Sequence, residues 1–412
     1  MENEKLSGND IIVGAQMLFV AFGALVLVPL LTGMNPSIAL FTAGIGTLLF
    51  QIITKASVPV FLASSFAFIA PIQIGIQQYG IGATLGGLAS ASIVYIILSI
   101  LIKVRGVKVI EEYLPPVVTG PVIMVIGLKL APVAVGMTKN FTGGKEVDYL
   151  AILVALFSLA VTIAVVLRGK GLLKLIPILC GITAGYILTL ILGKVSFDPI
   201  VNADWFSIPW VAALHDGSFQ WPVFDMRAIL FILPVAIAPA IEHVGDIIAI
   251  SEVAKKDFLK KPGLHRTLLG DGLATGLAAL LGGPPNTTYS EVTGAIALIK
   301  KFNPRLMTIA SVFAILLAFL GKLGAALKTI PIPVMGGILV LLFGMIAAIG
   351  IGSLVNHRVD MSKSRNLVIV SVILVFGIGD MLLGWGEFQL TGIGLAGIVG
   401  VLLNRLLPNQ KQ

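Results

Sequence analysis

The sequence predicts an all-α polytopic membrane protein with about 14 transmembrane segments. Of its 412 residues, 57% are hydrophobic and only 12% are charged, and its mean hydropathy is +1.02. A soluble domain of this composition would lack the charged surface that such domains carry. Apolar runs recur from one end of the chain to the other, and each has about the 17–25 residues that a helix needs to cross roughly 30 Å of hydrocarbon.

The polar breaks between the apolar runs place the spans in order. The first span follows a short polar N-terminus, Met1–Asp10, which lacks the anatomy of a signal peptide, so we expect this span to remain in the mature protein. The third and tenth spans are interrupted, and we expect short extended stretches within them. A polar stretch rich in Trp and Pro, from about 195 to 225, connects the seventh span to the eighth. The predicted spans are residues 10–33, 36–54, 59–78, 81–103, 115–137, 148–168, 172–194, 226–252, 264–282, 287–300, 304–322, 332–355, 366–382 and 388–407.

Basic residues concentrate on one side of the predicted membrane. The net charge of +8 could indicate nucleic-acid binding. With a cytoplasmic N-terminus, however, about 21 of the 28 Lys and Arg residues fall in cytoplasmic loops or termini, as the positive-inside rule describes. The charge is therefore a topology signal that argues against nucleic acid as a partner and predicts that both termini are cytoplasmic. The single cysteine, Cys180, excludes a disulfide framework within the chain and a metal site built from cysteines.

The chain also contains an internal repeat. Pro116–Gly120 aligns with Pro333–Gly337, and Ser64–Phe68 aligns with Thr287–Glu291. The first pair matches the fifth span with the twelfth and the second matches the third with the tenth. Because both pairs lie seven spans apart, an odd number, the two halves must cross the membrane in opposite directions, which predicts a 7+7 inverted repeat of the kind found in secondary transporters. The repeats are expected to occupy residues 1–195 and 222–412.

The tenth span is organised around a broken helix. Pro284 and Pro285 cannot continue a helix, and the polar run after them cannot face lipid as irregular chain. Helix is expected to resume at about Thr288, because Thr288 to Glu291 fits the S/T-x-x-E capping box. A half-helix that begins inside the membrane presents its first N–H groups to a polar substrate in many transporters.

Few charged side chains fall inside the predicted spans, and each is a functional candidate because charge at membrane depth is costly. Glu242 and Asp246 are four residues apart and therefore lie on one face of the eighth span. If Glu242 and Glu291 face one cavity, their carboxylates supply hydrogen-bond acceptors there, and the N–H groups of the broken helices supply donors between them. Such a site suits a neutral, flat, amide-like ligand, and neighbouring acids can hold a proton and release it. We therefore expect a proton-coupled transporter without catalytic residues, metal or cofactor.

Structural roles compete with these functional ones. Glu291 could serve only to close its capping box, and Asp246 could accept hydrogen bonds from the unpaired N–H groups of a helix end. We interpret His243 as a packed histidine, since no second metal ligand follows it in H-E-x-x-H order. Asp271 is interpreted as a structural acid near the membrane interface. A channel or an intramembrane enzyme is a more distant alternative, and the enzyme lacks a nucleophile–base pair.

A series of short motifs runs in order through nearly the whole chain. On these motifs the chain resembles the nucleobase–ascorbate transporters, and within them most closely the bacterial uracil permeases. The motifs are Ala21–Ala24 with Leu27–Pro29, Ala63–Phe68, Leu114–Pro116, Glu242–Gly245, Lys255–Asp257, Pro262–Arg266, Pro285–Tyr289 and Pro331–Gly337.

The resemblance implies a fold, an activity and a site. The fold would consist of a core domain (spans 1–4 and 8–11) and a gate domain (spans 5–7 and 12–14). The activity would be proton-coupled uptake of a nucleobase, uracil in the most similar branch, by a homodimer in the bacterial inner membrane. The implied roles are Glu242 for the ring N–H groups, Glu291 as the second ligand, the backbones of Phe66 and Ser290 for carbonyl oxygens, the side chains of Ala24, Tyr289 and Phe343 along the ring, and Asp246 or Glu291 for the proton.

Several positions depart from the uracil-permease pattern, among them Asp246, Ser290 and Val292, and they keep a second substrate open. Asp246 stands where these permeases usually have a histidine. An aspartate at this position is more similar to the purine and ascorbate branches. Ser290 replaces a usual glycine. Glu291 favours uracil, because the purine branches tend to carry glutamine there, so a proton-coupled xanthine or purine permease is the alternative.

Overall fold

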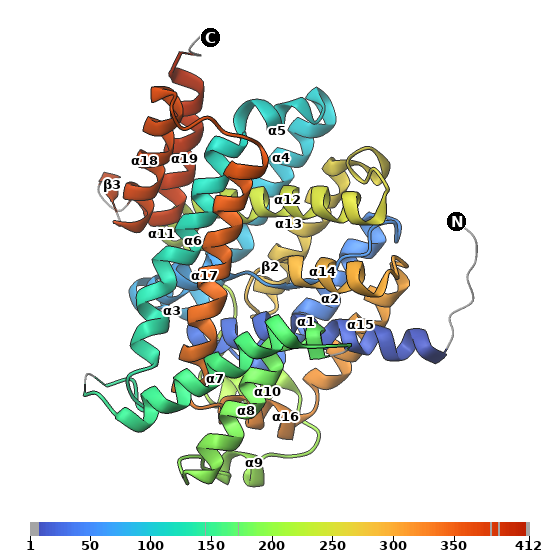
Figure 1. Ribbon diagram of the computed structural model, residues 1–412, viewed down its shortest axis with the longest axis vertical. Helices are drawn as coiled ribbons and strands as arrows, with labels where there is room; N and C mark the ends of the chain where they lie inside the picture. The colour runs from blue at the N-terminus through green and yellow to red at the C-terminus, as the bar shows by residue number, and fades with distance from the viewer. Residues whose placement is uncertain (1–7, 145, 172, 380, 386–387, 409–412) are drawn as a thin grey trace. The chain divides into compact units, whose positions relative to one another are not determined.

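The chain folds into helices and two short pairs of strands (Figure 1). The computed structural model describes residues 8–144, 146–171, 173–379, 381–385 and 388–408. Two compact units share the chain, and each is assembled from separated segments. Unit 1 comprises Met1–Val107, Ala203–Ile229 and Glu242–Gly324, and unit 2 comprises Lys108–Asn202, Leu230–Ile241 and Ala325–Gln412.

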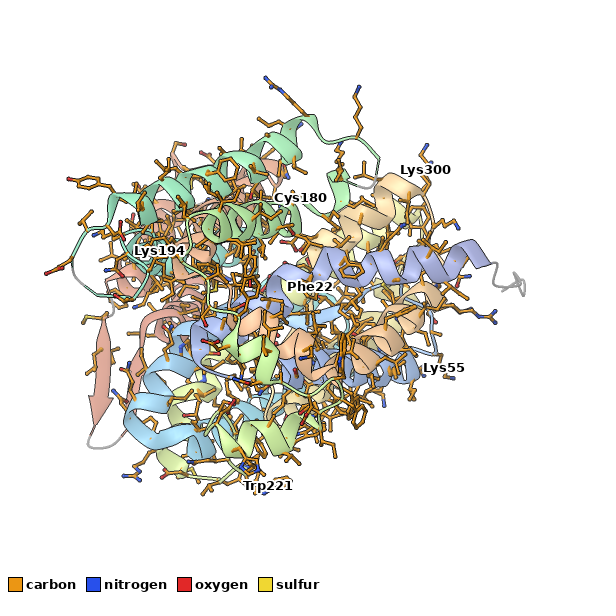
Figure 2. All side chains as sticks on the ribbon, turned by 90° about the horizontal axis from the view of Figure 1, so that it is seen from below. Phe22, Lys55, Cys180, Lys194, Trp221 and Lys300 are labelled. Atoms are coloured by element: carbon orange, nitrogen blue, oxygen red, sulfur yellow. The ribbon has the colours of Figure 1, made fainter. Side chains whose placement is uncertain are left out.

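Unit 1 is built around two helices, α2 and α13, that pack against each other, with α4 against α13 and α15 against α1 and α2. Figure 2 shows Phe22 within this unit, where it is buried, and Lys55 and Lys300 at its edge. Its elements are α1 (Gly8–Thr32), α2 (Pro36–Ile53), β1 (Leu62–Ser64), the 3₁₀ helix η1 (Phe66–Phe68), α3 (Ile69–Ser90), α4 (Ser92–Arg105), α10 (Pro209–His215), most of α12 (Ile237–Ala254), η4 (Leu259–Gly263), α13 (Leu264–Leu280), β2 (Asn286–Thr288), α14 (Ser290–Ile299) and α15 (Arg305–Ala318).

Unit 2 is organised by α6 and α17, which pack along each other (Figure 1). Small residues allow this approach: a Cβ added to Gly120 would lie 2.9 Å from the Gly350 carbonyl oxygen, so neither glycine has room for a side chain. The elements of the unit are α5 (Lys108–Tyr113), α6 (Pro116–Met137), α7 (Tyr149–Arg168), η2 (Leu173–Leu175), α8 (Pro177–Ile191), α9 (Asp198–Asn202), η3 (Leu233–Ala236), α17 (Ile332–Asn356), α18 (Ser364–Ile378), β3 (Leu382–Trp385), β4 (Phe388–Thr391) and α19 (Gly392–Leu406). The helices α11 (Met226–Ile232) and α16 (Gly321–Lys328) pass from one unit to the other.

Seven helical stretches in the described part of the chain are long and apolar enough to cross a membrane. Five shorter apolar helices of 10–17 residues accompany them, so the chain is a mostly helical, multi-pass membrane protein. A helix occurs in each of the predicted span ranges, although the count of 14 crossings stays a prediction. The seven stretches are Asp10–Thr32, Pro36–Ile53, Phe66–Arg105, Pro116–Met137, Tyr149–Arg168, Met226–Ala254 and Ile332–Asn356.

Gly80 divides the longest of these stretches. Its backbone has φ +80° and ψ 168° inside α3, a conformation that glycine adopts at little cost and other residues rarely adopt. The break falls between the predicted third span, which ends at residue 78, and the fourth, which begins at 81. Glycine therefore allows one continuous apolar run to change direction.

The predicted ends of the last two spans are wrong. Residues 366–382 and 388–407 were both expected to be helical throughout. Instead α18 ends at Ile378, and β3 and β4 pair antiparallel before α19 begins at Gly392. The error arises because a short apolar strand and a piece of buried helix have the same hydropathy.

The two broken spans meet at the strands β1 and β2. The strands pair antiparallel, with Leu62 opposite Thr288 and Ser64 opposite Asn286, and all six strand residues are buried. The helix α2 supports the pair, because Thr47 Oγ1 accepts the Leu62 N–H at 2.9 Å. Each strand ends one residue before the N-cap of a helix, so Ser64 of β1 is structurally equivalent to Thr288 of β2. The sequence alignment had paired Ser64 with Thr287 instead, one residue earlier.

Candidate functional site

The helix α12 carries Glu242 and Asp246 one turn apart. The side chain of Asp246 is buried, with 6% exposed, and that of Glu242 is half-buried. The carboxylate of Glu242 interacts electrostatically with those of Asp246 and Glu291, and Glu291 lies in the first turn of α14. Residues far apart in the sequence therefore bring three carboxyl groups together inside unit 1.

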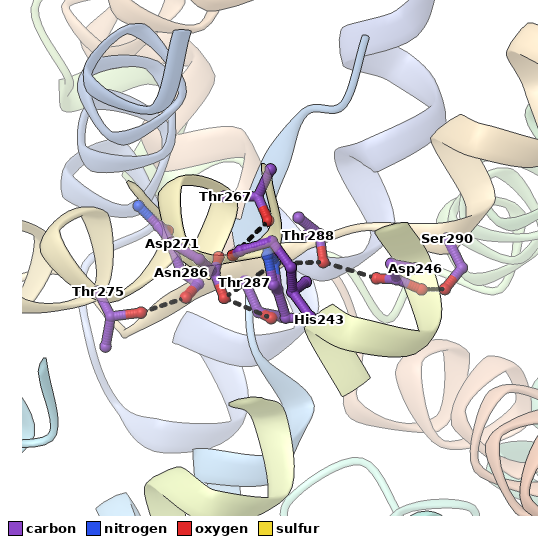
Figure 3. A network of polar contacts seen from close by, with 10 residues as sticks. His243, Asp246, Thr267, Asp271, Thr275, Asn286, Thr287, Thr288 and Ser290 are labelled. Atoms are coloured by element: carbon purple, nitrogen blue, oxygen red, sulfur yellow. Dashed lines mark hydrogen bonds and ion pairs between the residues drawn. The ribbon is translucent and has the colours of Figure 1, made fainter. Parts of the chain in front are cut away.

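Two hydroxyl groups at the junction of β2 and α14 hold Asp246 (Figure 3). Thr288 Oγ1 donates to Oδ2 at 2.7 Å, and Ser290 Oγ donates to Oδ1 at 2.5 Å. The predicted capping box is wrong, because α14 begins at Ser290 and its N-cap, Tyr289, makes no side-chain cap bond. Thr288 cannot cap the helix, since it pairs with Leu62 in the strand and its hydroxyl hydrogen is used by Asp246.

Each broken span presents the start of a helix next to the strand pair. η1 begins at Phe66, after the N-cap Ser65, and α14 begins at Ser290, after the N-cap Tyr289. The first N–H groups of a helix have no intrahelical acceptor and carry partial positive charge. Because the strands are antiparallel, these two helix starts lie at opposite ends of the strand pair.

The predicted lining residues divide between the two units. Tyr289 is 5% exposed, and its hydroxyl lies near the Ala24 backbone and the Glu291 carboxylate. Ala24 in α1 is fully buried, and Phe66 is also buried. Phe343 belongs to α17 of unit 2, where its side chain is 1% exposed. Unit 1 by itself therefore contains all of the predicted site residues except Phe343.

A second set of buried polar groups, which the sequence did not reveal as a cluster, continues from Asp246 (Figure 3). His243 Nδ1 lies 3.4 Å from Thr288 Oγ1 and 3.4 Å from Asp271 Oδ2. Thr287 Oγ1 donates to the same Asp271 oxygen at 3.5 Å. The side chains of His243 and Asp271 are completely buried, so Asp271 lies in the interior of the protein, and the expectation that it lies near the membrane interface stays a prediction. Its place in the interior of α13 and its charge were the available signals.

The strand β2 is also fastened to its neighbours through Asn286. The Asn286 Nδ2 group donates to the Thr42 backbone carbonyl at 2.9 Å, and the backbone carbonyl of Asn286 accepts from Thr275 Oγ1 at 2.5 Å. Within the described ranges, no three His, Cys, Asp or Glu side chains gather as metal ligands. The arrangement offers carboxylates as acceptors and helix starts and hydroxyls as donors, which suits a neutral polar ligand and a proton.

Comparison with known proteins finds relatives over nearly the whole chain. The family model of the xanthine and uracil permeases, described as "Permease family", matches residues 8–384. A probable uracil permease of Haemophilus influenzae is 56% identical over 402 residues, which cover 97% of this chain and 94% of that protein. A uracil permease of Bacillus caldolyticus is 46% identical over 410 residues, covering 98% and 93%, and one of Bacillus subtilis is 43% identical over 403 residues, covering 96% and 92%.

Solved structures of transporters share the fold. The transmembrane domain of a cyanobacterial bicarbonate transporter, BicA, matches with a TM-score of 0.66 at 13% identity, covering 96% of each chain. The murine anion transporter Slc26a9 matches with a TM-score of 0.66 at 12% identity, covering 98% of this chain and 69% of that one. At such identities the likeness concerns the fold alone. The whole-length matches to permeases identify a transporter rather than an enzyme, and the chain belongs to the xanthine and uracil permease family, the nucleobase–ascorbate transporters.

Proposed function

We propose that this protein is a proton-coupled uracil permease. One observation carries the proposal: the antiparallel pairing of β1 and β2 places two helix starts in the unit that holds Glu242, Asp246 and Glu291. Acceptors and N–H donors then face a ligand that offers both kinds of group. Relatives named uracil permease, at 43–56% identity over nearly the whole chain, support uracil as that ligand.

Uracil has two ring N–H groups and two carbonyl oxygens in one plane. In this proposal the Glu242 carboxylate accepts from ring N–H groups, and Glu291 supplies the second acidic contact. The backbone N–H groups of Phe66 and Ser290 donate to the carbonyl oxygens, as helix N-termini do for other polar ligands. Ala24, Tyr289 and Phe343 cover the ring. An anion would be repelled by the carboxylates, which argues for a neutral base.

The proton is assigned to the acidic cluster. Three neighbouring carboxylates in a poorly hydrated interior repel one another strongly, so the site is more stable when one of them is protonated. Asp246 and Glu291 are the candidates, because Glu242 is needed as an ionised acceptor. Binding of uracil would then be linked to the binding of a proton from the side of higher proton concentration.

The transport cycle is proposed to be alternating access. The predicted core domain (spans 1–4 and 8–11) would carry the site, and the predicted gate domain (spans 5–7 and 12–14) would contribute Phe343 and expose the site to one side at a time. The inverted repeat that the sequence predicts for residues 1–195 and 222–412 supports this scheme, because two halves of opposite orientation can exchange roles. We further propose that both termini lie in the cytoplasm, from the distribution of basic residues, and that the protein is a homodimer in the bacterial inner membrane, as the family resemblance implies.

A xanthine or purine permease is the second candidate, and Asp246 is the observation that favours it. Its carboxylate stands where the uracil permeases usually have a histidine. Glu291, in place of the glutamine common in purine branches, weighs toward uracil.

Uptake into proteoliposomes tests both candidates. Labelled uracil would be offered with an inward proton gradient, with unlabelled xanthine, guanine or thymine as competitors. Saturable, gradient-driven uptake that excess uracil abolishes and xanthine does not would support the proposal. Inhibition by xanthine at lower concentration than by uracil would assign the protein to the purine branch. Absence of uptake of any base by the folded protein would overturn the site assignment.

A further inference from the structure

The buried histidine of α12 has one nitrogen placed between two acceptors. Thr288 Oγ1 has a single hydrogen, and it is directed to Asp246 Oδ2 at 2.7 Å. Toward His243 Nδ1, at 3.4 Å, the same oxygen can only accept. The second neighbour of Nδ1, Asp271 Oδ2 at 3.4 Å, is a carboxylate oxygen. A hydrogen on Nδ1 is therefore shared by two acceptors, whereas a bare Nδ1 would face two oxygen lone pairs.

The other ring nitrogen supports the same assignment. His243 Nε2 is buried and has no hydrogen-bond partner among the described residues. A buried N–H donor without an acceptor loses its hydrogen bonds to water and gains none in return, and orphaned buried donors are rarer than under-satisfied acceptors. The ring of Phe50 lies edge-on to the imidazole at a centroid distance of 6.3 Å, which restricts rotation of the ring. Burial and packing thus favour hydrogen on Nδ1 and none on Nε2.

We propose that His243 is a positioning residue that acts on Asp246 through Thr288. Its Nδ1–H group donates toward Thr288 Oγ1 and Asp271, and this keeps the Thr288 hydroxyl hydrogen on Asp246. The chain of donors runs from His243 to Thr288 to Asp246, and Ser290 donates to the same carboxylate from the other side. Asp246 is the terminal acceptor, and the histidine sets the orientation of the group that faces it.

The two oxygens of Asp246 differ in how readily each can take up a proton. A proton on Oδ2 would require the Thr288 hydroxyl to turn back toward the histidine that already donates to it. Within the described ranges of the chain, Oδ1 accepts a hydrogen bond from Ser290 alone, whose side chain is half-buried and whose hydroxyl can turn to accept. The proton that Asp246 takes up is therefore assigned to Oδ1. In the part of the chain that the structure describes, the other titratable groups that face this cluster are Glu242 on α12, Asp271 on α13, Tyr289 and Glu291 at the start of α14, and Tyr95 on α4.

The hydrogen position can be measured directly. Nitrogen-15 NMR of the full-length protein, labelled on histidine and embedded in lipid, distinguishes a ring nitrogen that carries hydrogen from one that does not. The chain has four histidines, and His243→Asn identifies the signal of interest by its loss. The expected spectrum has hydrogen on Nδ1 and none on Nε2. Hydrogen on Nε2, in a neutral or a charged ring, would overturn the inference.

Two matched variants test the positioning role, which rests on the proposed function. The amide nitrogen of Asn can replace Nδ1–H, whereas the amide nitrogen of Gln reaches the position of Nε2. We expect His243→Asn to retain the pH profile of uracil uptake and His243→Gln to shift it. We also expect His243→Gln to lower the ratio of maximal rate to KM about tenfold. This is the effect of losing one hydrogen bond in a series that ends on a charged carboxylate. Thr288→Ser should match the wild type, and Thr288→Val should match His243→Gln.

The outcomes separate the two proposals. If the wild type takes up uracil but the Asn and Gln variants behave alike in both pH profile and KM, the positioning role is wrong and the proposed function stands. If the folded wild type takes up no base, the proposed function fails, and the NMR experiment still decides the hydrogen position. Thermal unfolding of each variant in detergent shows that a loss of uptake does not come from a loss of fold.

Discussion

The two broken spans of unit 1 have similar backbones and different side-chain chemistry. β1 and β2 are three-residue strands, each followed by an N-cap residue without a side-chain cap bond and then by a helix start. The hydroxyls of the second span, on Thr287 and Thr288, bond Asp271 and Asp246. The hydroxyls of Ser64 and Ser65 in the first span are buried without a hydrogen-bond partner in the described part of the chain.

This difference separates the backbone donors, which both spans offer, from the side-chain hydrogen bonds to acids, which the second span makes. Both broken spans contain a strand and a helix start, which gives the backbone donors. Among the residues that the structure describes, the hydroxyl groups of the second span donate to acids of α12 and α13, whereas those of Ser64 and Ser65 have no such partner. The first span is therefore expected to act through its backbone, and the second through its backbone and its side chains. The variants below test this contrast, from the largest expected effect to the smallest.

Glu242→Gln should have the largest effect on uptake. The amide removes the charged acceptor that the ring N–H groups of the base require, and two charge-assisted hydrogen bonds at about 1.5–3 kcal/mol each correspond to a loss of about 100-fold or more in transport efficiency. Labelled uracil uptake into proteoliposomes measures it. Glu252→Gln, an exposed change on the same helix, is the matched control and should leave uptake intact. Equal uptake by both variants would remove Glu242 from the site.

Thr288→Val should destabilise the protein more than Ser64→Ala, although the two residues occupy equivalent positions. The valine leaves the buried Asp246 carboxylate with one hydroxyl donor, which should lower the free energy of unfolding by about 1–3 kcal/mol. The alanine removes a hydroxyl that bonds nothing described, and the change should stay within about 0.5 kcal/mol. Unfolding in detergent compares them, and equal losses would contradict the contrast.

Ser290→Ala should have a moderate effect that appears mainly in KM. The start of α14 would lose the 2.5 Å hydrogen bond that the Ser290 hydroxyl donates to Asp246. We expect KM for uracil to rise about threefold to tenfold, as for the loss of one hydrogen bond of about 1 kcal/mol. Ser290→Thr keeps the hydroxyl and serves as the control. A rise in KM for Thr equal to that for Ala would assign the effect to shape instead.

Ser65→Ala should have the smallest effect. Ser65 contributes its backbone N–H to the Pro285 carbonyl at 2.9 Å, and alanine retains that bond. Uptake and unfolding free energy should both stay within about 0.5 kcal/mol of the wild type. A large loss of uptake would show that the first span also works through a side chain, and it would remove the contrast between the spans.

Much of the helical fold was predictable from the sequence because hydropathy reports how long each apolar run is. The break that was expected between residues 78 and 81 coincides with the non-helical backbone of Gly80, which glycine tolerates, while the count of spans stays a prediction. The hairpin of β3 and β4 was missed, because strand pairing depends on a partner that a local window does not contain. The start of α14 was misplaced by two residues for the same reason, since Thr288 pairs with Leu62 rather than capping the helix.

The sequence by itself determined that this is a multi-pass permease and that Glu242, Asp246 and Glu291 are unusual charges in apolar surroundings. The spacing of Glu242 and Asp246 also placed both on one helix face, because helix geometry is local. Only the tertiary structure decided that Thr288 and Ser290 bond Asp246 and that His243 and Asp271 lie together. These contacts join α12, α13 and the β2–α14 junction, and hydrogen bonds between distant segments depend on packing that no local pattern contains.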